Sequence, residues 1–152
     1  MPEIKLVTEI HAPIETCFDA ARSIDLHKQS TSKSKEEAIA GRTYGLCEKG
    51  DTVTWRATHL GVRQKLTSEI TEMNRPYFFE DKMLKGAFKS MIHKHFFEFR
   101  NGKTILTDNF QYESPLWIFG KLADKLFLER YMRKFLLERN AFLKMICEKQ
   151  IR

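Results

Sequence analysis

Hydrophobic and polar residues alternate over several segments of the chain, the pattern of strands that bury one face. The segments Ile4–Ile10, Thr52–His59 and Val62–Glu72 show it most clearly. Because a period of two places every second side chain on the same face, each segment has a predicted inner and outer face. Four more strands are predicted, at Glu36–Ala40, Tyr77–Leu84, Phe88–Phe99 and Lys103–Glu113.

Helical patterns lie between the first two strands and at the C-terminal end. Pro13 is suited to a first helical turn, and it opens a short helix. The apolar residues of this helix recur at helical spacing: Ile14, Phe18 and Ala21. Asp25 is expected to cap a second short helix. From Ser114-Pro115 a long helix is predicted to run from about Leu116 to Ile151.

The connections between the later strands are short. Asn101-Gly102, between the last two strands, is the strongest hairpin signal in the sequence. Strands joined by short turns pair antiparallel, and the helices then cover one side of the sheet. The expected fold is α+β: a six- to seven-stranded antiparallel curved sheet around a long C-terminal helix, with two short helices between the first two strands. We expect residues 1–152 to form a single domain.

The long C-terminal helix carries two apolar stripes that do not coincide. One consists of Phe119, Leu122, Ala123 and Leu126, and the other of Leu128, Tyr131, Phe135, Phe142 and Ile146. Either the helix bends near Phe127–Leu128, or it is apolar on two sides. Leu122 and Leu126 are expected to contact the inner face of the sheet.

Composition indicates a globular chain with a large apolar interior. It has 152 residues, 42% hydrophobic and 30% charged, and twelve are Phe. No apolar run is long enough to span a membrane, and Glu3, Lys5 and Glu9 interrupt the N-terminal apolar stretch, so no signal peptide is expected. The three cysteines, Cys17, Cys47 and Cys147, form no Cys-x-x-Cys pair. The sequence therefore favours a cytoplasmic protein with reduced thiols.

The net charge of +6 comes from the C-terminal end. Residues 1–120 carry 17 basic and 16 acidic side chains, whereas residues 121–152 carry nine basic and four acidic ones. This asymmetry argues against nucleic-acid binding by the domain as a whole, and no nucleic-acid partner is expected. A basic, partly apolar helix face could contact an anionic membrane or a partner through Lys125, Arg130, Arg133, Lys134 and Arg139. A solvated helix face is the simpler interpretation.

Several motifs occur in an order that resembles a known superfamily. The segment His11-Ala-Pro-Ile-Glu-Thr-Cys-Phe-Asp-Ala20 is similar to the x-A-P-x-E-x-V-F-D opening of the START-like helix-grip superfamily, also called SRPBCC, and departs from it at Cys17. One bacterial branch has similar motifs: Gly50-Asp-Thr-Val-Thr-Trp55, His93-x-His95-x-Phe97, Thr107-Asp108-x-Phe110 and Ser114-Pro-Leu116. The group includes polyketide cyclase/dehydrase-like proteins and lipid-transport domains. The resemblance implies a deep cavity for a hydrophobic or amphipathic small molecule, but no particular reaction.

Polar residues fall on the predicted inner faces among aromatic neighbours. His93 and His95 share a face that is opposite to Lys94 and Glu98, so both imidazoles should point inward. Inner positions of the other strands add further polar and aromatic groups. The candidate ligand-binding residues are Trp55, His59, Gln64, Asp81, His93, His95, Asp108 and Phe110.

Three interpretations of the inward histidines stay open. With Asp108 they can form a structural network across neighbouring strands, since an unsatisfied buried polar group costs about 1–3 kcal/mol. They can instead orient the carbonyl or hydroxyl of a ligand. As a third interpretation, the His-x-His spacing can chelate a metal, with His59, Asp81 or Asp108 as a further ligand. We expect no metal, because the helix-grip group that the sequence resembles is not generally metal-dependent. We expect no other cofactor either, because the sequence has no phosphate-binding loop or dinucleotide fingerprint.

Three functions follow, in order of preference. The first is a carrier or sensor that binds a hydrophobic or amphipathic small molecule, lipid or polyketide-like. The second is an enzyme of the cyclase/dehydratase type, in which an inward His or Asp moves protons. The third is binding of a membrane or partner through the basic helix. The sequence leaves the identity of the ligand and the oligomeric state open.

Overall fold

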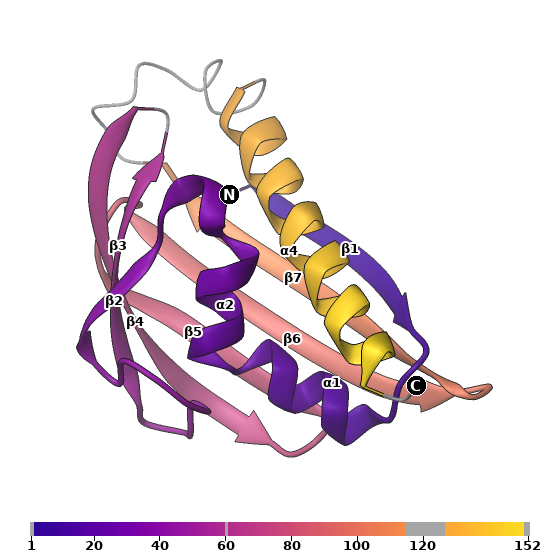
Figure 1. Cartoon of the computed structure of the whole chain (residues 1–152). Coiled ribbons are helices and arrows are strands. Elements are labelled where there is room, and N and C mark those ends of the chain that lie inside the picture. The colour runs from indigo at the N-terminus through magenta and orange to yellow at the C-terminus, as the bar shows by residue number, and fades with distance from the viewer. Residues whose placement is uncertain (1, 60, 115–126, 151–152) are drawn as a thin grey trace.

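The seven strands of the computed structural model form one antiparallel sheet (Figure 1), within the described residues 2–59, 61–114 and 127–150. The strands are β1 (Glu3–Ile10), β2 (Glu37–Gly41), β3 (Thr52–His59), β4 (Val62–Asn74), β5 (Phe78–Lys85), β6 (Ser90–Arg100) and β7 (Lys103–Glu113). Their order in the sheet is β1-β7-β6-β5-β4-β3-β2. From β2 to β7, consecutive strands are thus neighbours in the sheet, and β7 also pairs with β1.

The β6–β7 hairpin shows how local chemistry sets the register. Arg100 pairs with Lys103, so Asn101 and Gly102 form a two-residue loop. Their φ angles are 55° and 78°. Asn and Gly tolerate this left-handed region best, which is why they favour the tight turn between twisted strands. The register set here places His93 opposite Phe110 and His95 opposite Asp108.

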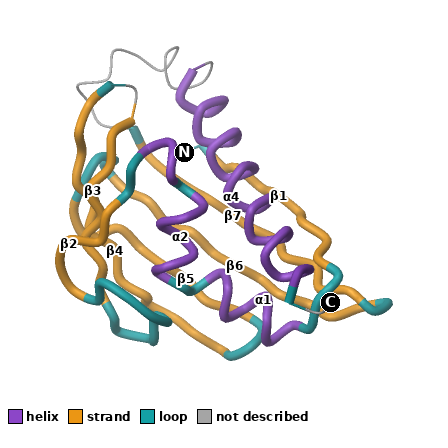
Figure 2. The backbone as a smooth tube through the Cα atoms, in the orientation of Figure 1, coloured by secondary structure: helices purple, strands orange, loops and turns teal. Residues whose placement is uncertain are grey.

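The helices lie on one face of the sheet (Figure 2). Between β1 and β2 the chain forms α1 (Ile14–Ala21), α2 (Ile24–Ser30) and a short 3₁₀ helix, η1 (Ser32–Ser34). The expectation that Asp25 caps α2 is wrong. The cap is Ser23, whose hydroxyl accepts a hydrogen bond from the Leu26 amide at 3.2 Å. Asp25 lies inside the first turn of α2, and its carboxylate accepts from the Gly45 amide instead.

The C-terminal helix α4 (Glu129–Lys149) packs against β1, α1 and α2. Phe127 and Leu128 form a π-helical turn directly before it, at the place where the two apolar stripes diverge. The predicted helix start at Leu116 and end at Ile151 lie outside the described residues. Leu122 and Leu126, with their expected contacts to the sheet, lie outside them as well.

The buried face of α4 is displaced from the predicted stripe and is more polar, because Tyr131, Phe135, Phe142 and Ile146 are only half-buried. Its buried residues recur every three or four positions: Met132, Leu136, Arg139, Asn140, Leu143 and Cys147. Arg139 is only 5% exposed, so its placement in a basic surface strip is wrong. Its guanidinium lies 3.7 Å from the Asp108 carboxylate. The attraction to the buried Asp108 carboxylate explains why the Arg139 side chain turns inward.

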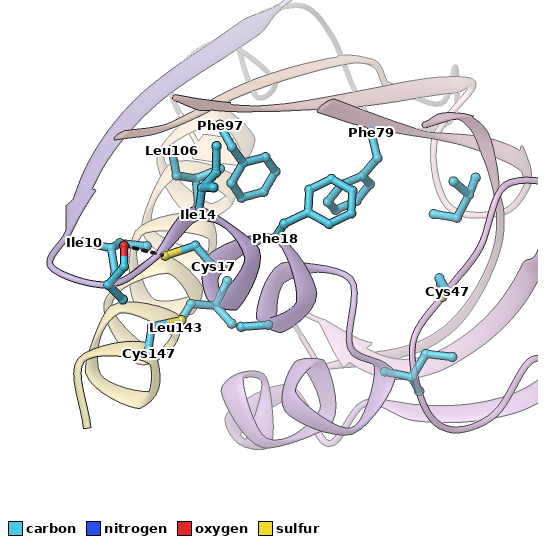
Figure 3. Packing of buried hydrophobic residues seen from close by; sticks show 14 of the residues in the cluster. Ile10, Ile14, Cys17, Phe18, Cys47, Phe79, Phe97, Leu106, Leu143 and Cys147 are labelled. Carbon is cyan, nitrogen blue, oxygen red and sulfur yellow. Dashed lines mark hydrogen bonds between the residues drawn. The ribbon is translucent and has the colours of Figure 1, made fainter. Parts of the chain in front are cut away.

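Aromatic rings fill the interior near α1 (Figure 3). The Phe18 ring meets the edges of Phe79 and Phe97 at centroid distances of 5.4 and 5.2 Å. Leu143 of α4 belongs to the same cluster. A second cluster joins the start of α4 to β1, β6 and β7 through Ile4, Leu6, Met91, Phe110, Tyr112, Leu128, Met132 and Leu136. These two packed regions fix α4 relative to the sheet.

All three cysteines are free and buried. A membrane-crossing helix, which needs about 18 or more mostly apolar residues, is absent from the described part of the chain.

Candidate functional site

A cavity of about 480 Å³ lies between the inner face of the sheet and the helices α2 and α4. Strand alternation accounts for its wall, because the residues that β4 contributes at every second position all line it: Val62, Gln64, Leu66, Ser68 and Ile70. From β3 the same period brings in Val53, Trp55, Ala57 and His59. Helix α4 closes the other side with Tyr131, Met132, Phe135, Leu136 and Arg139.

The structure brings seven of the eight predicted site residues to this wall: Trp55, His59, Gln64, Asp81, His93, His95 and Phe110. Asp108 is placed differently. It is 0% exposed and lies behind the two histidines, so it does not reach the cavity surface. Alternation predicted the face of Asp108 correctly but not its depth, because the imidazoles from β6 cover it.

Asp108 is the centre of a buried polar group that we call the sheet cluster: Asp81, His93, His95 and Asp108. One Asp108 oxygen lies 2.8 Å from His93 Nε2 and 3.1 Å from His95 Nδ1. The other accepts a hydrogen bond from Asn140 Nδ2 at 2.7 Å. Helix α4 therefore supplies a neutral donor, in addition to the charged Arg139, to a carboxylate that has no access to water.

The second carboxylate of the sheet cluster is Asp81, on β5. It lies 2.8 Å from His95 Nε2. His95 stacks between two rings, with Phe79 at 4.1 Å and His93 at 3.8 Å between centroids. This stacking fixes the plane of the imidazole between its two carboxylate partners.

The two imidazoles of the sheet cluster have opposite pKa shifts. Burial, together with the neighbouring His95, lowers the pKa of His93 to about 4. Burial also acts to lower the pKa of His95, but contacts with Asp108 and Asp81 outweigh it and raise that pKa. Burial opposes ionisation of Asp81 and Asp108 too, yet their histidine partners lower both carboxyl pKa values. The cluster thus holds its proton on His95.

Donor atoms of Asp81, His93 and His95 lie within 4.8 Å of one another, a composition that suits a transition metal. The ring geometry fits a metal poorly. The two imidazole rings are stacked 3.8 Å apart with their planes inclined by only 29°, so their in-plane lone pairs lie in separate, nearly parallel planes and do not converge on one point. The buried guanidinium of Arg139 adds a positive charge 3.7 Å from Asp108. This geometry favours a hydrogen-bonded cluster that shares a proton.

A second polar group lies in the same wall and was not predicted from the sequence. We call it the Glu36 cluster: His27, Glu36, His59 and Tyr131. Glu36 lies 2.5 Å from His27 Nε2 and 3.5 Å from His59 Nε2. His59 Nδ1 lies 2.6 Å from the Tyr131 hydroxyl. Only His59 was predicted, because Glu36 immediately precedes β2 and the faces of α2 and α4 depend on their packing.

Glu36 is ionised although it is buried. Burial acts to raise its pKa, but His27 and His59 outweigh burial and lower the pKa to about 2. Burial raises the pKa of Tyr131, and the negative charge of Glu36 raises it further. The Tyr131 hydroxyl therefore keeps its proton at neutral pH.

The remaining predicted residues frame the two clusters. The Trp55 indole packs on His27 of α2 at 4.4 Å between ring centroids. Phe110 meets His93 edge to face at 5.2 Å. The cavity is thus an apolar space with two polar groups, and a bound molecule could contact either one.

Solved structures share this architecture over almost the whole chain. A protein from Thermus thermophilus, TTHA0849, has a TM-score of 0.78 at 20% identity, covering 95% of both chains. A START superfamily protein from Mycobacterium smegmatis has a TM-score of 0.72 at 14% identity, covering 97% of this chain and 98% of the other. Major latex-like protein 151 from Panax ginseng reaches a TM-score of 0.70 at 15% identity, covering 96% and 97%.

At these identities the similarity is one of fold. No family model matches the chain, and none of the curated proteins matches it significantly. The chain has the START-like helix-grip fold, as the motifs around His11 and His93 predicted.

Proposed function

We propose that this chain, as a single domain over residues 1–152, binds a hydrophobic or amphipathic small molecule between the sheet and α4, as a carrier or sensor. The observation that carries the proposal is the cavity of about 480 Å³. Its size lies within the range of small-molecule sites, roughly 300–1,000 Å³. Its wall is mainly apolar, as a site that extracts a molecule from water requires.

The sheet cluster supports an oriented ligand. His93 and His95 line the cavity, although an interior built only for stability would avoid desolvated imidazoles. Since the Asp108 carboxylate is ionised, neutral His93 turns Nε2–H toward it, and Nδ1 is then an acceptor for a polar group of the ligand. Trp55, Gln64 and Phe110 complete the apolar and polar surroundings in this proposal.

Native mass spectrometry of the purified protein, followed by organic extraction, tests whether a molecule co-purifies. Titration with 1-anilinonaphthalene-8-sulfonate tests the cavity directly, through the rise in fluorescence on transfer to an apolar site. We expect saturable binding with one probe per chain. A protein that carries no molecule and binds no probe would overturn the proposal.

A cyclase/dehydratase-type reaction is the second candidate, because the sheet cluster pairs a neutral imidazole with a protonated one. His93 can accept a proton while His95 holds one, the arrangement that acid–base catalysis needs. Deuterium exchange at the α-carbon of 2-tetralone in heavy water, followed by NMR, would report such activity. Exchange faster than in buffer, and lost in His93→Phe, favours catalysis, whereas exchange at the buffer rate favours a carrier or sensor.

Location and surface contacts are part of the same proposal. Three free thiols fit a reducing cytoplasm. Peripheral membrane contact through Arg130, Arg133 and Lys134 beside the exposed Phe127 is a weaker proposal, because Arg139 is buried and Arg133 lies 3.8 Å from Glu129. Flotation with phosphatidylserine vesicles tests it, with phosphatidylcholine vesicles as the control.

A further inference from the structure

The Glu36 cluster forms a continuous series of polar contacts across the cavity wall. It runs from His27 on α2 through Glu36, which immediately precedes β2, to His59 on β3 and Tyr131 on α4. The Glu36 side chain is 8% exposed, and all four residues line the cavity. Helix α4 packs against β1, α1 and α2. The hydrogen bond between His59 and Tyr131 additionally connects α4 to β3.

The chemistry of these groups fixes the direction of each hydrogen bond. An ionised carboxylate only accepts, so the charge of Glu36, 3.5 Å from His59 Nε2, favours the tautomer with its proton on Nε2. In this tautomer of His59 the other nitrogen, Nδ1, is an acceptor. The Tyr131 hydroxyl keeps its proton and donates it to Nδ1 at 2.6 Å.

The Tyr131 oxygen is left as an acceptor. Its single proton points at His59, while its lone pairs are available to a donor. Among the described residues, His59 is the one hydrogen-bond partner of this hydroxyl. Phe135 packs edge to face on His59 at 5.3 Å beside it, so the oxygen lies in partly apolar surroundings. A ligand with a hydrogen-bond donor can fill this position, whereas a ligand with only acceptors cannot.

We propose that Tyr131, oriented by His59 and Glu36, binds a hydroxyl group of the ligand, so that the cavity selects apolar molecules that carry a hydroxyl. This inference rests on the proposed small-molecule binding and narrows its ligand class. The carboxylate acts through His59: its negative charge beside Nε2 favours the tautomer whose Nδ1 accepts from Tyr131. Tyr131 is the contact, and His59 and Glu36 are positioning residues.

Two probes of the same ring system test the selection: 2-naphthol, which donates a hydrogen bond, and 2-methoxynaphthalene, which cannot. Their dissociation constants are measured by calorimetry at the same mildly alkaline pH. We expect the wild-type chain to bind 2-naphthol about threefold to tenfold more tightly, the effect of one net hydrogen bond.

Tyr131→Phe keeps the ring and removes the oxygen. In this variant 2-naphthol and 2-methoxynaphthalene should bind about equally tightly, and the affinity for 2-methoxynaphthalene should change by less than about twofold. Tyr44→Phe is the matched control, because Tyr44 is 72% exposed and does not line the cavity. His59→Phe frees the Tyr131 proton for the oxygen of either probe, so it should also reduce the preference.

The outcomes separate this inference from the function on which it rests. Equal wild-type binding of the two probes overturns the hydroxyl selection and leaves small-molecule binding supported. A preference that survives in Tyr131→Phe also overturns it, by placing the hydroxyl elsewhere in the cavity. If neither probe binds to the wild-type chain, both the inference and the proposed function fail.

Discussion

The imidazole of His93 stacks on that of His95 with ring centroids 3.8 Å apart, yet only His95 is in close contact with both Asp81 and Asp108, at 2.8 and 3.1 Å. Two positive charges at this distance in a buried site repel each other strongly. The proton therefore stays on His95, between Asp81 and Asp108. His93 is the neutral ring of the pair, and both rings line the cavity.

This division predicts two different pH dependences. The folded-state pKa of His93 falls from 6.5 to about 4, so His93 contributes stability above pH 6.5 and loses it as the pH falls toward 4. His95 has a raised pKa in the folded state. Its contribution is complete below the pKa of the unfolded chain and is lost as the pH rises through the folded-state pKa.

Urea unfolding at a series of pH values measures both effects. Between pH 6.5 and 4, the free energy of unfolding should fall by on the order of 3 kcal/mol less in His93→Phe than in the wild-type chain. His11→Phe, at an exposed histidine, should retain the wild-type slope. Parallel curves for His93→Phe and the wild-type chain would show that His93 titrates normally.

Ligand binding should depend on the same two histidines. His93→Phe and His95→Phe keep the ring volume but remove the nitrogens. His93→Phe removes the Nδ1 acceptor, so it should weaken binding of the co-purified molecule or of 1-anilinonaphthalene-8-sulfonate directly. Both nitrogens of His95 face carboxylates, so His95→Phe should weaken binding only through the position of His93. A loss of about 1 kcal/mol, or about fivefold in dissociation constant, is expected per lost hydrogen bond. Fluorescence titration measures it, with His11→Phe as the control. Unchanged affinity together with easier unfolding would make both histidines structural.

Asp108→Asn tests the centre of the sheet cluster. The substitution keeps the shape of the side chain and removes its charge, which leaves His95 and Arg139 with fewer negative partners. We expect a loss of about 3–5 kcal/mol in the free energy of unfolding, as for a broken buried ion pair. The pKa of His95 should also fall, which NMR titration measures.

Glu98→Gln is the control for this substitution, because Glu98 lies on the outer face of β6 with its side chain 64% exposed. It makes the same chemical change at the surface, where a charge contributes less than about 1 kcal/mol. If both substitutions cost equally little, the Asp108 carboxylate does not hold the cluster together.

The sequence predicted most of the fold because its signals are local. Alternation in β3, β4, β6 and β7, and the Asn101-Gly102 turn, set strand faces and register. The same alternation brought His93 and His95 to the inner face. These predictions required only the period of a strand and the chemistry of a turn.

The missing parts of the site depend on packing between distant segments. Tyr131 meets His59 across 72 positions of the chain, and Arg139 meets Asp108 across 31. The rotation of α4 about its axis decides which of its residues reach the sheet, and no periodicity in the sequence specifies that angle. The periodicity of the sequence also does not reveal that the Glu36 side chain, immediately before β2, is buried. A charged residue can be predicted to be buried only when the residues that pair with it are known.

Cavity and core should respond differently to loss of volume in α4. Leu136 and Leu143 are 3% and 2% exposed, but Leu136 lines the cavity whereas Leu143 packs in the aromatic cluster with Phe18. Leu143→Ala should cost about 2–5 kcal/mol, since it opens a void in a closely packed region. Leu136→Ala should cost less, because the removed atoms already border a space, and it should enlarge the site for bulkier probes.

Leu137→Ala, at a half-exposed position on the same helix, controls for changes in helix propensity. Denaturant unfolding and titration with a series of alkylated naphthalenes distinguish the two substitutions. If Leu136→Ala costs as much as Leu143→Ala and leaves the size limit of the probes unchanged, Leu136 is as closely packed as Leu143, and the cavity does not extend to α4 there.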